Sequence, residues 1–237
     1  MPDVTIRAAD GGSFSAYLAT PTGAAAGGNG RGPGILLIQE IFGVNKVMRD
    51  LADGFAKQGH VVLCPDLFWR QEPGIQITDK TEAEWAKAFS LYKSFDEAKG
   101  VEDLTATLKH LRALPACTGK VGAVGYCLGG KLAYLMATRS DADASVGYYG
   151  VGIEGALDEA KSIRKPLMLH IAEQDEYCPP PAQAKIKAAL EGNAHVTLHS
   201  YAGQNHAFAR AGGQHYDEKS AALANERTAA FFRKNLV

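Results

Sequence analysis

A cysteine held between glycines is the residue of this sequence whose setting most favours chemistry. Cys127 lies in Gly125-Tyr-Cys-Leu-Gly129, which follows the apolar run Val121–Val124 and precedes a helix-forming segment that begins at Lys131. A nucleophile placed between a strand and a helix, with a glycine two residues away on each side, is typical of the tight turn called a nucleophile elbow. The glycines are needed because the strand and the helix approach closely at this turn. We therefore predict that Cys127 acts as a nucleophile.

The predicted turn would also activate the sulfur. A helix N-terminus carries a partial positive charge, which favours the thiolate form of Cys127. The backbone N–H of Leu128 is directed toward the same place and can donate a hydrogen bond to a developing oxyanion. The alternative is that Cys127 is a small buried apolar residue, which is the usual state of a free cysteine.

A cysteine nucleophile needs a base, and the base needs an orienting carboxylate. Asp175 follows the apolar run Leu167–Ile171, and His206 follows the run Val196–Tyr201. The chain order nucleophile, acid, histidine is the order found in hydrolases built around such an elbow. Asp175 could instead cap a turn or a helix. His206 is one of seven histidines, and a single histidine is more often structural than catalytic.

Short apolar runs alternate with helical segments along the chain, and these elements must position the three residues. Most runs are bounded by glycine or proline and several are rich in β-branched residues, as expected of buried parallel strands. The predicted strands cover residues 34–38, 60–64, 120–125, 144–149, 166–171 and 195–199. Helical spacing of apolar residues occurs between them, for example at Leu104, Leu108 and Leu111.

This alternation predicts an α/β fold with a mostly parallel central sheet and helices on both faces. Ligand sites in such sheets lie outside the carboxyl ends of the strands, where Cys127, Asp175 and His206 are all expected. The length favours one domain over residues 1–237. Near the N-terminus, alternating apolar residues around Asp10-Gly-Gly12 predict a β-hairpin, and the glycine-rich stretch Thr22–Gly34 predicts a surface loop.

Composition and charge limit the classes of partner. The chain is 46% hydrophobic and 22% charged, which is ordinary for a soluble globular domain. A net charge of −1 and a pI of about 6.7 favour neither nucleic acid nor an anionic membrane as a partner. The N-terminus lacks the pattern of a signal peptide, and no early apolar run has the length of a membrane span. Four cysteines without C-x-x-C spacing indicate reduced thiols and a cytoplasmic location.

Six stretches of the chain match the pattern of one known family, namely Gln39-Glu-Ile-Phe-Gly43, Pro65-Asp-Leu-Phe68, Gly122-Ala-Val-Gly-Tyr-Cys-Leu-Gly-Gly130, Val146-Gly-Tyr-Tyr-Gly-Val-Gly152, Gln174-Asp175 and His206-Ala-Phe-Ala-Arg210. From Ile35 onward, nearly the whole chain resembles the dienelactone hydrolase family. The combination of the first and third stretches is specific. The resemblance implies the α/β-hydrolase fold.

The resemblance also implies a reaction and roles for further residues. Members of the family open dienelactone to maleylacetate with a Cys-His-Asp triad, through an acyl-cysteine intermediate and without a cofactor. The residue matching Glu40 interacts with the resting nucleophile, and the N–H groups matching Ile41 and Leu128 form the oxyanion hole. We expect a small-molecule ester or lactone as substrate and a monomeric protein.

The sequence departs from the family at one arm of the substrate clamp. Family members that act on dienelactone resemble one another in holding its carboxylate with two arginines, a task that suits the bidentate guanidinium. One matches Arg210, but the other falls at Trp85, and this change favours a less acidic or more aromatic ester. Trp85, Phe89 and Tyr92 share one helical face, which could line the pocket or face the core.

Other functions stay open at this point. The chain could be a broad-specificity carboxylesterase, a thiol-redox protein that oxidises Cys127 without turning over an ester, or a non-catalytic ligand-binding relative. His195 and His199 have the spacing of a metal pair, but no third ligand is evident and we expect no metal. Glu40, Cys127, Asp175 and His206 together favour a hydrolase. Neither a thiol-redox protein nor a non-catalytic ligand-binding protein requires all four residues.

Overall fold

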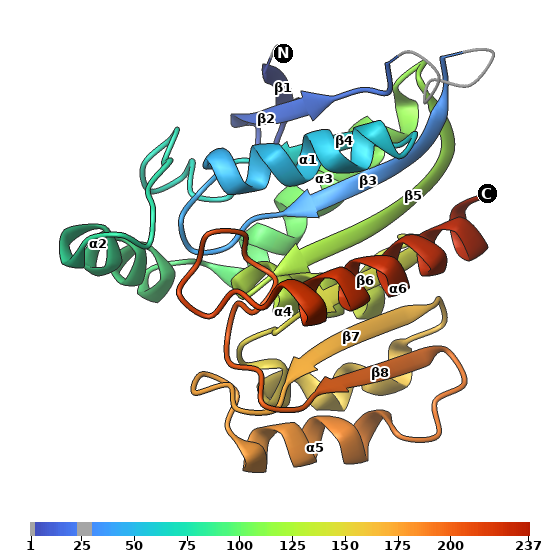
Figure 1. The fold of residues 1–237 in the computed structure, drawn as a ribbon. Helices are drawn as coiled ribbons and strands as arrows, with labels where there is room; N and C mark the ends of the chain where they lie inside the picture. Colours follow the sequence, from blue (N-terminus) through green and yellow to red (C-terminus); the bar gives the residue numbers. More distant parts are fainter. Residues whose placement is uncertain (1–2, 23–29) are drawn as a thin grey trace. The chain divides into compact units, whose positions relative to one another are not determined.

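The structure is a computed structural model that describes residues 3–22 and 30–237 (Figure 1). The chain groups into two compact units, Met1–Gly122 and Ala123–Val237. The single domain expected over residues 1–237 stays a prediction. Residues 23–29, which make up much of the loop predicted at Thr22–Gly34, lie outside the described residues. Among the described residues, no helix combines the length and the apolar character needed to cross a membrane.

The first unit begins with the predicted hairpin. Strands β1 (Asp3–Arg7) and β2 (Ser13–Ala19) pair antiparallel, with Ile6 opposite Phe14. The turn between them contains Gly11 at a φ of 93°, in the left-handed region that glycine adopts without strain. Ile6 and Phe14 are buried, so the alternating pattern in the sequence is the pattern of burial.

Two parallel strands and three α-helices complete the part of the first unit that the structure describes. Strands β3 (Gly32–Ile38) and β4 (Val61–Pro65) pair in parallel, and the strand order is β1-β2-β4-β3. The helices are α1 (Lys46–Lys57), α2 (Glu82–Lys93) and α3 (Glu97–Ala113). Each helix begins after a residue whose side chain accepts a hydrogen bond from the first turn, namely Asn45, Thr81 or Asp96. The predicted apolar face of α3 is fully buried.

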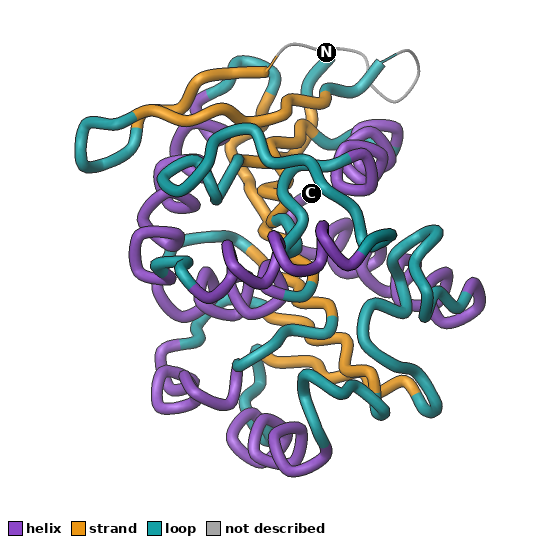
Figure 2. Tube along the Cα trace, turned by 90° about the vertical axis from the view of Figure 1, so that its left-hand side faces the viewer, coloured by secondary structure: helices purple, strands orange, loops and turns teal. Residues whose placement is uncertain are grey.

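The second unit continues the α/β alternation. Strand β5 (Cys117–Tyr126) enters it at Ala123, and the strand order is then β5-β6-β7-β8, with β6, β7 and β8 parallel. The other strands are β6 (Ala144–Tyr148), β7 (Leu167–Ala172) and β8 (Val196–Tyr201). The helices are α4 (Leu128–Arg139), the 3₁₀ helix η2 (Ile153–Ser162), α5 (Pro180–Leu190) and α6 (Glu218–Leu236). Helices lie on both sides of these strands (Figure 2).

A buried polar chain ties helix α6 to the strands. The Tyr148 hydroxyl donates to Asn225 Oδ1 at 3.0 Å and lies 2.6 Å from Thr228 Oγ1. His170 Nε2 lies 3.0 Å from Thr228 Oγ1, and His170 Nδ1 lies 2.7 Å from the Tyr201 hydroxyl. The Tyr148 hydroxyl donates its only proton to Asn225, so the Thr228 hydroxyl donates to Tyr148. The Thr228 oxygen then accepts a hydrogen bond from the Nε2–H of His170. Burial holds the pKa of His170 well below its ordinary value, which agrees with this neutral tautomer.

Candidate active site

Cys127 occupies a tight turn between β5 and α4. Its backbone has a φ of 57° and a ψ of −115°, which a residue with a side chain rarely adopts. A Cβ at Gly125 would lie 1.9 Å from the carbonyl oxygen of Gly129, so this position accepts only glycine. The strand, turn and helix predicted around Cys127 are therefore present, and Leu128 is the first residue of α4.

A second layer of glycines brings α4 close to the end of β6. A Cβ at Gly130 would lie 2.4 Å from the Tyr148 carbonyl oxygen and 2.9 Å from Gly150 Cα. The Cys127 N–H donates to that same carbonyl oxygen at 3.1 Å. The segment around Gly150 was part of the family resemblance, but its physical role could not be read from the sequence. It is the surface against which the turn at Cys127 packs.

Asp175 and His206 form a buried hydrogen-bonded pair. His206 Nδ1 lies 2.8 Å from Asp175 Oδ2, and the two residues are 5% and 2% exposed. Asp175 Oδ1 accepts from the Tyr177 N–H at 2.9 Å, which fixes the carboxylate. The loops that carry the pair are joined by a hydrogen bond from Gln174 N to Gln204 O at 2.8 Å. A carboxylate held in this way orients the imidazole and sets its tautomer.

The charge on His206 depends on Cys127. Burial alone would lower the pKa of His206, but the negative charge of Cys127 and hydrogen bonds to Asp175 and Cys127 raise this pKa to about 10. The imidazole is thus within hydrogen-bonding reach of the sulfur. Because Nδ1 faces Asp175, the other ring nitrogen, Nε2, is the one available to Cys127.

This coupling can be measured without turnover. In the wild-type protein, the His206 ring should titrate far above the ordinary histidine pKa of about 6.5, near the value of about 10 expected with the thiolate present. In Cys127→Ser the thiolate charge is lost, so the pKa of His206 should fall. NMR titration of the imidazole resonances gives both values. An unchanged His206 pKa in the serine variant would contradict the coupling.

Two tyrosines contact the His206 ring, and neither was singled out from the sequence. Tyr149 meets the imidazole at a centroid distance of 5.2 Å and Tyr177 at 4.9 Å, both edge to face. Tyr149 has a φ of 36° and Ala207, directly after His206, has a φ of 62°. With Cys127, these are the non-glycine residues of positive φ in the described chain. Such conformations cost about 1–3 kcal/mol each and cluster at functional sites.

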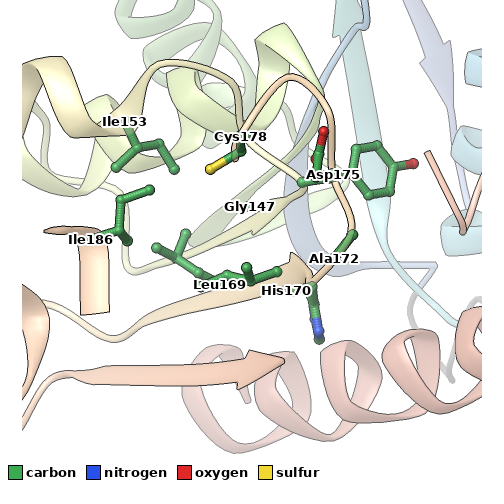
Figure 3. A pocket seen from close by; sticks show the side chains of 11 residues that line it. Gly147, Ile153, Leu169, His170, Ala172, Asp175, Cys178 and Ile186 are labelled. Carbon is green, nitrogen blue, oxygen red and sulfur yellow. The ribbon is translucent and has the colours of Figure 1, made fainter. Parts of the chain in front are cut away.

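A small cavity borders Asp175. It is lined mainly by apolar side chains, among them Ile153, Leu169 and Ile186, and has room for about one water molecule. The Cys178 sulfur points into it (Figure 3). Burial first, and then the charges of Asp175 and Glu154, raise the pKa of Cys178 to about 12, so this cysteine is an unreactive thiol. The cavity is too small for an ester.

The remaining predicted site residues divide between the two units. Arg210 lies in the second unit, is 8% exposed, and its charge lowers the pKa of Tyr177 against the larger effect of burial. Glu40 and Ile41 lie in the first unit, in the loop after β3, and both are buried. Gln39 Oε1 accepts from Leu67 N at 3.1 Å and anchors this loop. The roles of Glu40 and Ile41 toward Cys127 stay predictions.

The aromatic face of α2 packs against the loop that contains Ile41. Trp85 meets Phe42 edge to face at 5.0 Å and stacks on Phe89 at 5.5 Å, while its indole N–H donates to Asp79 O at 3.1 Å. Trp85, Phe89 and Tyr92 are only partly buried. This face of α2 therefore contributes to packing, which is one of the two roles that its spacing allowed. The other role, lining the substrate pocket, stays a prediction.

Known proteins resemble this chain over nearly its whole length. Residues 14–236 match the Dienelactone hydrolase family. The chain belongs to this family. A relative from Azospirillum brasilense is 51% identical over 246 residues, covering 100% of both chains. The carboxymethylenebutenolidase of Pseudomonas putida is 39% identical to this dienelactone hydrolase family member, over 96% of this chain and 94% of the relative.

A solved structure establishes the fold of this dienelactone hydrolase family member. A protein from Klebsiella pneumoniae subsp. pneumoniae superposes with a TM-score of 0.84 at 24% identity, over 98% of each chain. The fold is thus the predicted α/β-hydrolase fold, with a mixed but mostly parallel arrangement of strands. At this identity the likeness concerns the fold alone.

Proposed function

We propose that the protein hydrolyses a lactone or an activated carboxylic ester, with Cys127 as nucleophile, His206 as acid and base, and Asp175 as the group that orients His206. The observation that carries the proposal is the buried pair of Asp175 and His206, whose imidazole is within hydrogen-bonding reach of a cysteine at an elbow turn. A buried structural cysteine would need neither partner.

The first half of the proposed reaction forms an acyl-enzyme. The Cys127 thiolate attacks the carbonyl carbon, a C–S bond forms, and the carbonyl electrons move onto oxygen. The N–H at the start of α4, Leu128, donates to this oxyanion, and the family resemblance assigns the second donor to Ile41. Collapse breaks the C–O bond of the ester. For an enol lactone the leaving group is a stabilised enolate. The proton that His206 Nε2 has taken from the Cys127 thiol passes to this enolate, which leaves the imidazole neutral for the second half.

The second half releases the product. His206 takes a proton from a water molecule, the resulting hydroxide attacks the acyl carbon, and the C–S bond breaks to return the thiolate. The products are the free acid and the regenerated Cys127–His206 pair. Asp175 keeps the Nδ1 proton in place throughout, so Nε2 is the nitrogen that exchanges protons.

The substrate is proposed from the relatives and from one substitution. The 39% identical relative is named carboxymethylenebutenolidase, which supports a lactone that carries a carboxylate. Arg210 is retained as one cationic partner for such a group. By the family resemblance, the second cationic partner falls at Trp85, which belongs to an aromatic cluster with Phe42 and Phe89. This cluster favours a second candidate, a carboxylesterase that accepts more apolar or aromatic esters.

The two candidates differ in their response to Trp85→Arg. The purified protein should hydrolyse an activated aryl ester, and the variant should raise kcat/KM for cis- or trans-dienelactone by about tenfold, because a charge-assisted hydrogen bond contributes about 1.5–3 kcal/mol. Release of product is followed by absorbance. Turnover of the neutral aryl ester should not gain from the new charge.

Lys87→Arg is the matched control, because it places a guanidinium two residues away on a different side of α2. It should leave dienelactone turnover unchanged. If Trp85→Arg did not raise kcat/KM for dienelactone, a second cationic partner at this position would be contradicted and the carboxylesterase would be favoured. Absence of turnover for every ester and lactone would reject the proposed function. The expected monomer belongs to the same proposal and is checked by light scattering.

A further inference from the structure

We propose that Tyr177 is a positioning residue, whose ring holds the plane of the His206 imidazole and shields the His206–Asp175 hydrogen bond from water. The inference rests on the proposed function, in which that hydrogen bond orients the base. It adds a residue that neither the elbow motif nor the order of the triad indicates. Asp175, Tyr177 and His206 all belong to the second unit.

The first support is that one residue contacts both members of the pair. The ring of Tyr177 meets the imidazole at 4.9 Å with an interplanar angle of 75°. Its backbone N–H donates to Asp175 Oδ1 at 2.9 Å. The backbone bond places the ring, and the ring then restrains the imidazole. Tyr149 makes a second contact at 5.2 Å and 64°, so His206 is restrained by two aromatic rings.

The second support is the position of Tyr177 at the boundary with solvent. Asp175, His206 and Tyr149 are all buried, whereas Tyr177 is 38% exposed. Tyr177 is thus the ring of this group that meets water. A hydrogen bond that is kept from water is electrostatically stronger and holds its geometry better. Removing the ring should open the His206 side of the pair to water.

The third support concerns which part of Tyr177 acts. Burial first, and then the charges of Glu176, Cys127 and Asp175, raise the pKa of Tyr177, so the phenol stays neutral near the catalytic pair. Within residues 3–22 and 30–237, its hydroxyl makes no side-chain hydrogen bond, unlike the hydroxyls of Tyr148 and Tyr201. The ring, and not the hydroxyl, therefore carries the proposed role. Phenylalanine should replace it, and alanine should not.

The test compares Tyr177→Ala with Tyr177→Phe by two readouts. The first is the far-downfield proton resonance of His206 Nδ1–H, whose exchange with water measures the shielding directly and needs no turnover. In Tyr177→Ala this exchange should accelerate by at least about tenfold, and kcat for an activated aryl ester should fall by about tenfold. Tyr177→Phe should keep both values within about twofold of the wild type.

Tyr216→Ala is the matched control, because Tyr216 is a similarly exposed tyrosine without a ring contact to His206 in the described chain. It should change neither readout. Tyr177→Leu gives the same test if the alanine variant folds poorly, and circular dichroism with the Tm checks the fold. A protected proton and an unchanged kcat in Tyr177→Ala would overturn the inference, as would a phenylalanine variant that behaves like alanine. If no ester is hydrolysed but proton exchange still follows the ring, the proposed function fails and the positioning of His206 stands.

Discussion

Cys127→Ala is expected to reduce kcat/KM for an activated aryl ester by about 10,000-fold or more, since removal of a nucleophile from a triad leaves only the oxyanion donors and binding. The sulfur lies at the turn where helix α4 begins, and it contributes more than Asp175 to raising the pKa of His206. Without it no acyl-enzyme can form. Steady-state hydrolysis and mass spectrometry of the trapped acyl-enzyme measure the effect.

The control for this substitution is Cys64→Ala, which removes another buried sulfur, from β4 in the first unit. Its turnover should stay close to that of the wild type, apart from a modest loss of stability from the small cavity. Equal ester turnover in Cys127→Ala and the wild type would reject the mechanism. A thiol-redox role would be favoured instead if His206→Ala left ester turnover untouched while Cys127 still reacted with peroxide.

Asp175→Asn is expected to lower kcat by about 100-fold to 10,000-fold through the wrong histidine tautomer. Asp175 Oδ1 accepts from the Tyr177 N–H, so the oxygen of the new amide must take that place. The amide NH₂ then faces His206 Nδ1, which has to accept a hydrogen bond in place of donating one. The ring proton moves to Nε2, and that nitrogen can no longer take a proton from Cys127 or from water.

Asp158→Asn makes the same chemical change at an exposed position of η2 and should leave kcat unchanged. A pH profile separates a tautomer effect from a loss of folding. The asparagine variant should keep its Tm approximately and lose kcat across the whole pH range. If kcat of Asp175→Asn stayed within a few-fold of the wild type, Asp175 would not be the orienting group.

The strands were predictable because a buried parallel strand corresponds to a short apolar run in the sequence. The run at residues 166–171 is β7 (Leu167–Ala172), and the run at 195–199 is β8 (Val196–Tyr201). Their carboxyl ends carry Asp175 and His206, so the order of the runs predicted the order of the site. The elbow was predictable for a different reason, because close contact between strand and helix at Gly125 excludes any side chain.

The contacts between distant segments could not be predicted in this way. In the sequence, nothing distinguishes Tyr149 and Tyr177 from other aromatic residues. The ring that they contact, His206, lies 57 and 29 residues away along the chain. The chain from Tyr148 through Thr228 to His170 joins a helix to two strands, and no local pattern marks it. Strand β5 also begins at Cys117, before the predicted run at Lys120, because polar residues at its start are tolerated outside the buried part. Propensity and period describe neighbours in sequence, whereas these features depend on neighbours in space.

The left-handed or otherwise disfavoured backbones of Cys127, Tyr149 and Ala207 set a limit on how far this protein can be made more robust. Glycine would relax each of these backbones, but at two of the three positions it would remove the sulfur or a ring that touches His206. Ala207 is the exception, because its methyl group has no part in the proposed chemistry. Substitutions that raise the free energy of unfolding should therefore be sought at Ala207. At Cys127 and Tyr149, a gain in stability would come at the expense of activity.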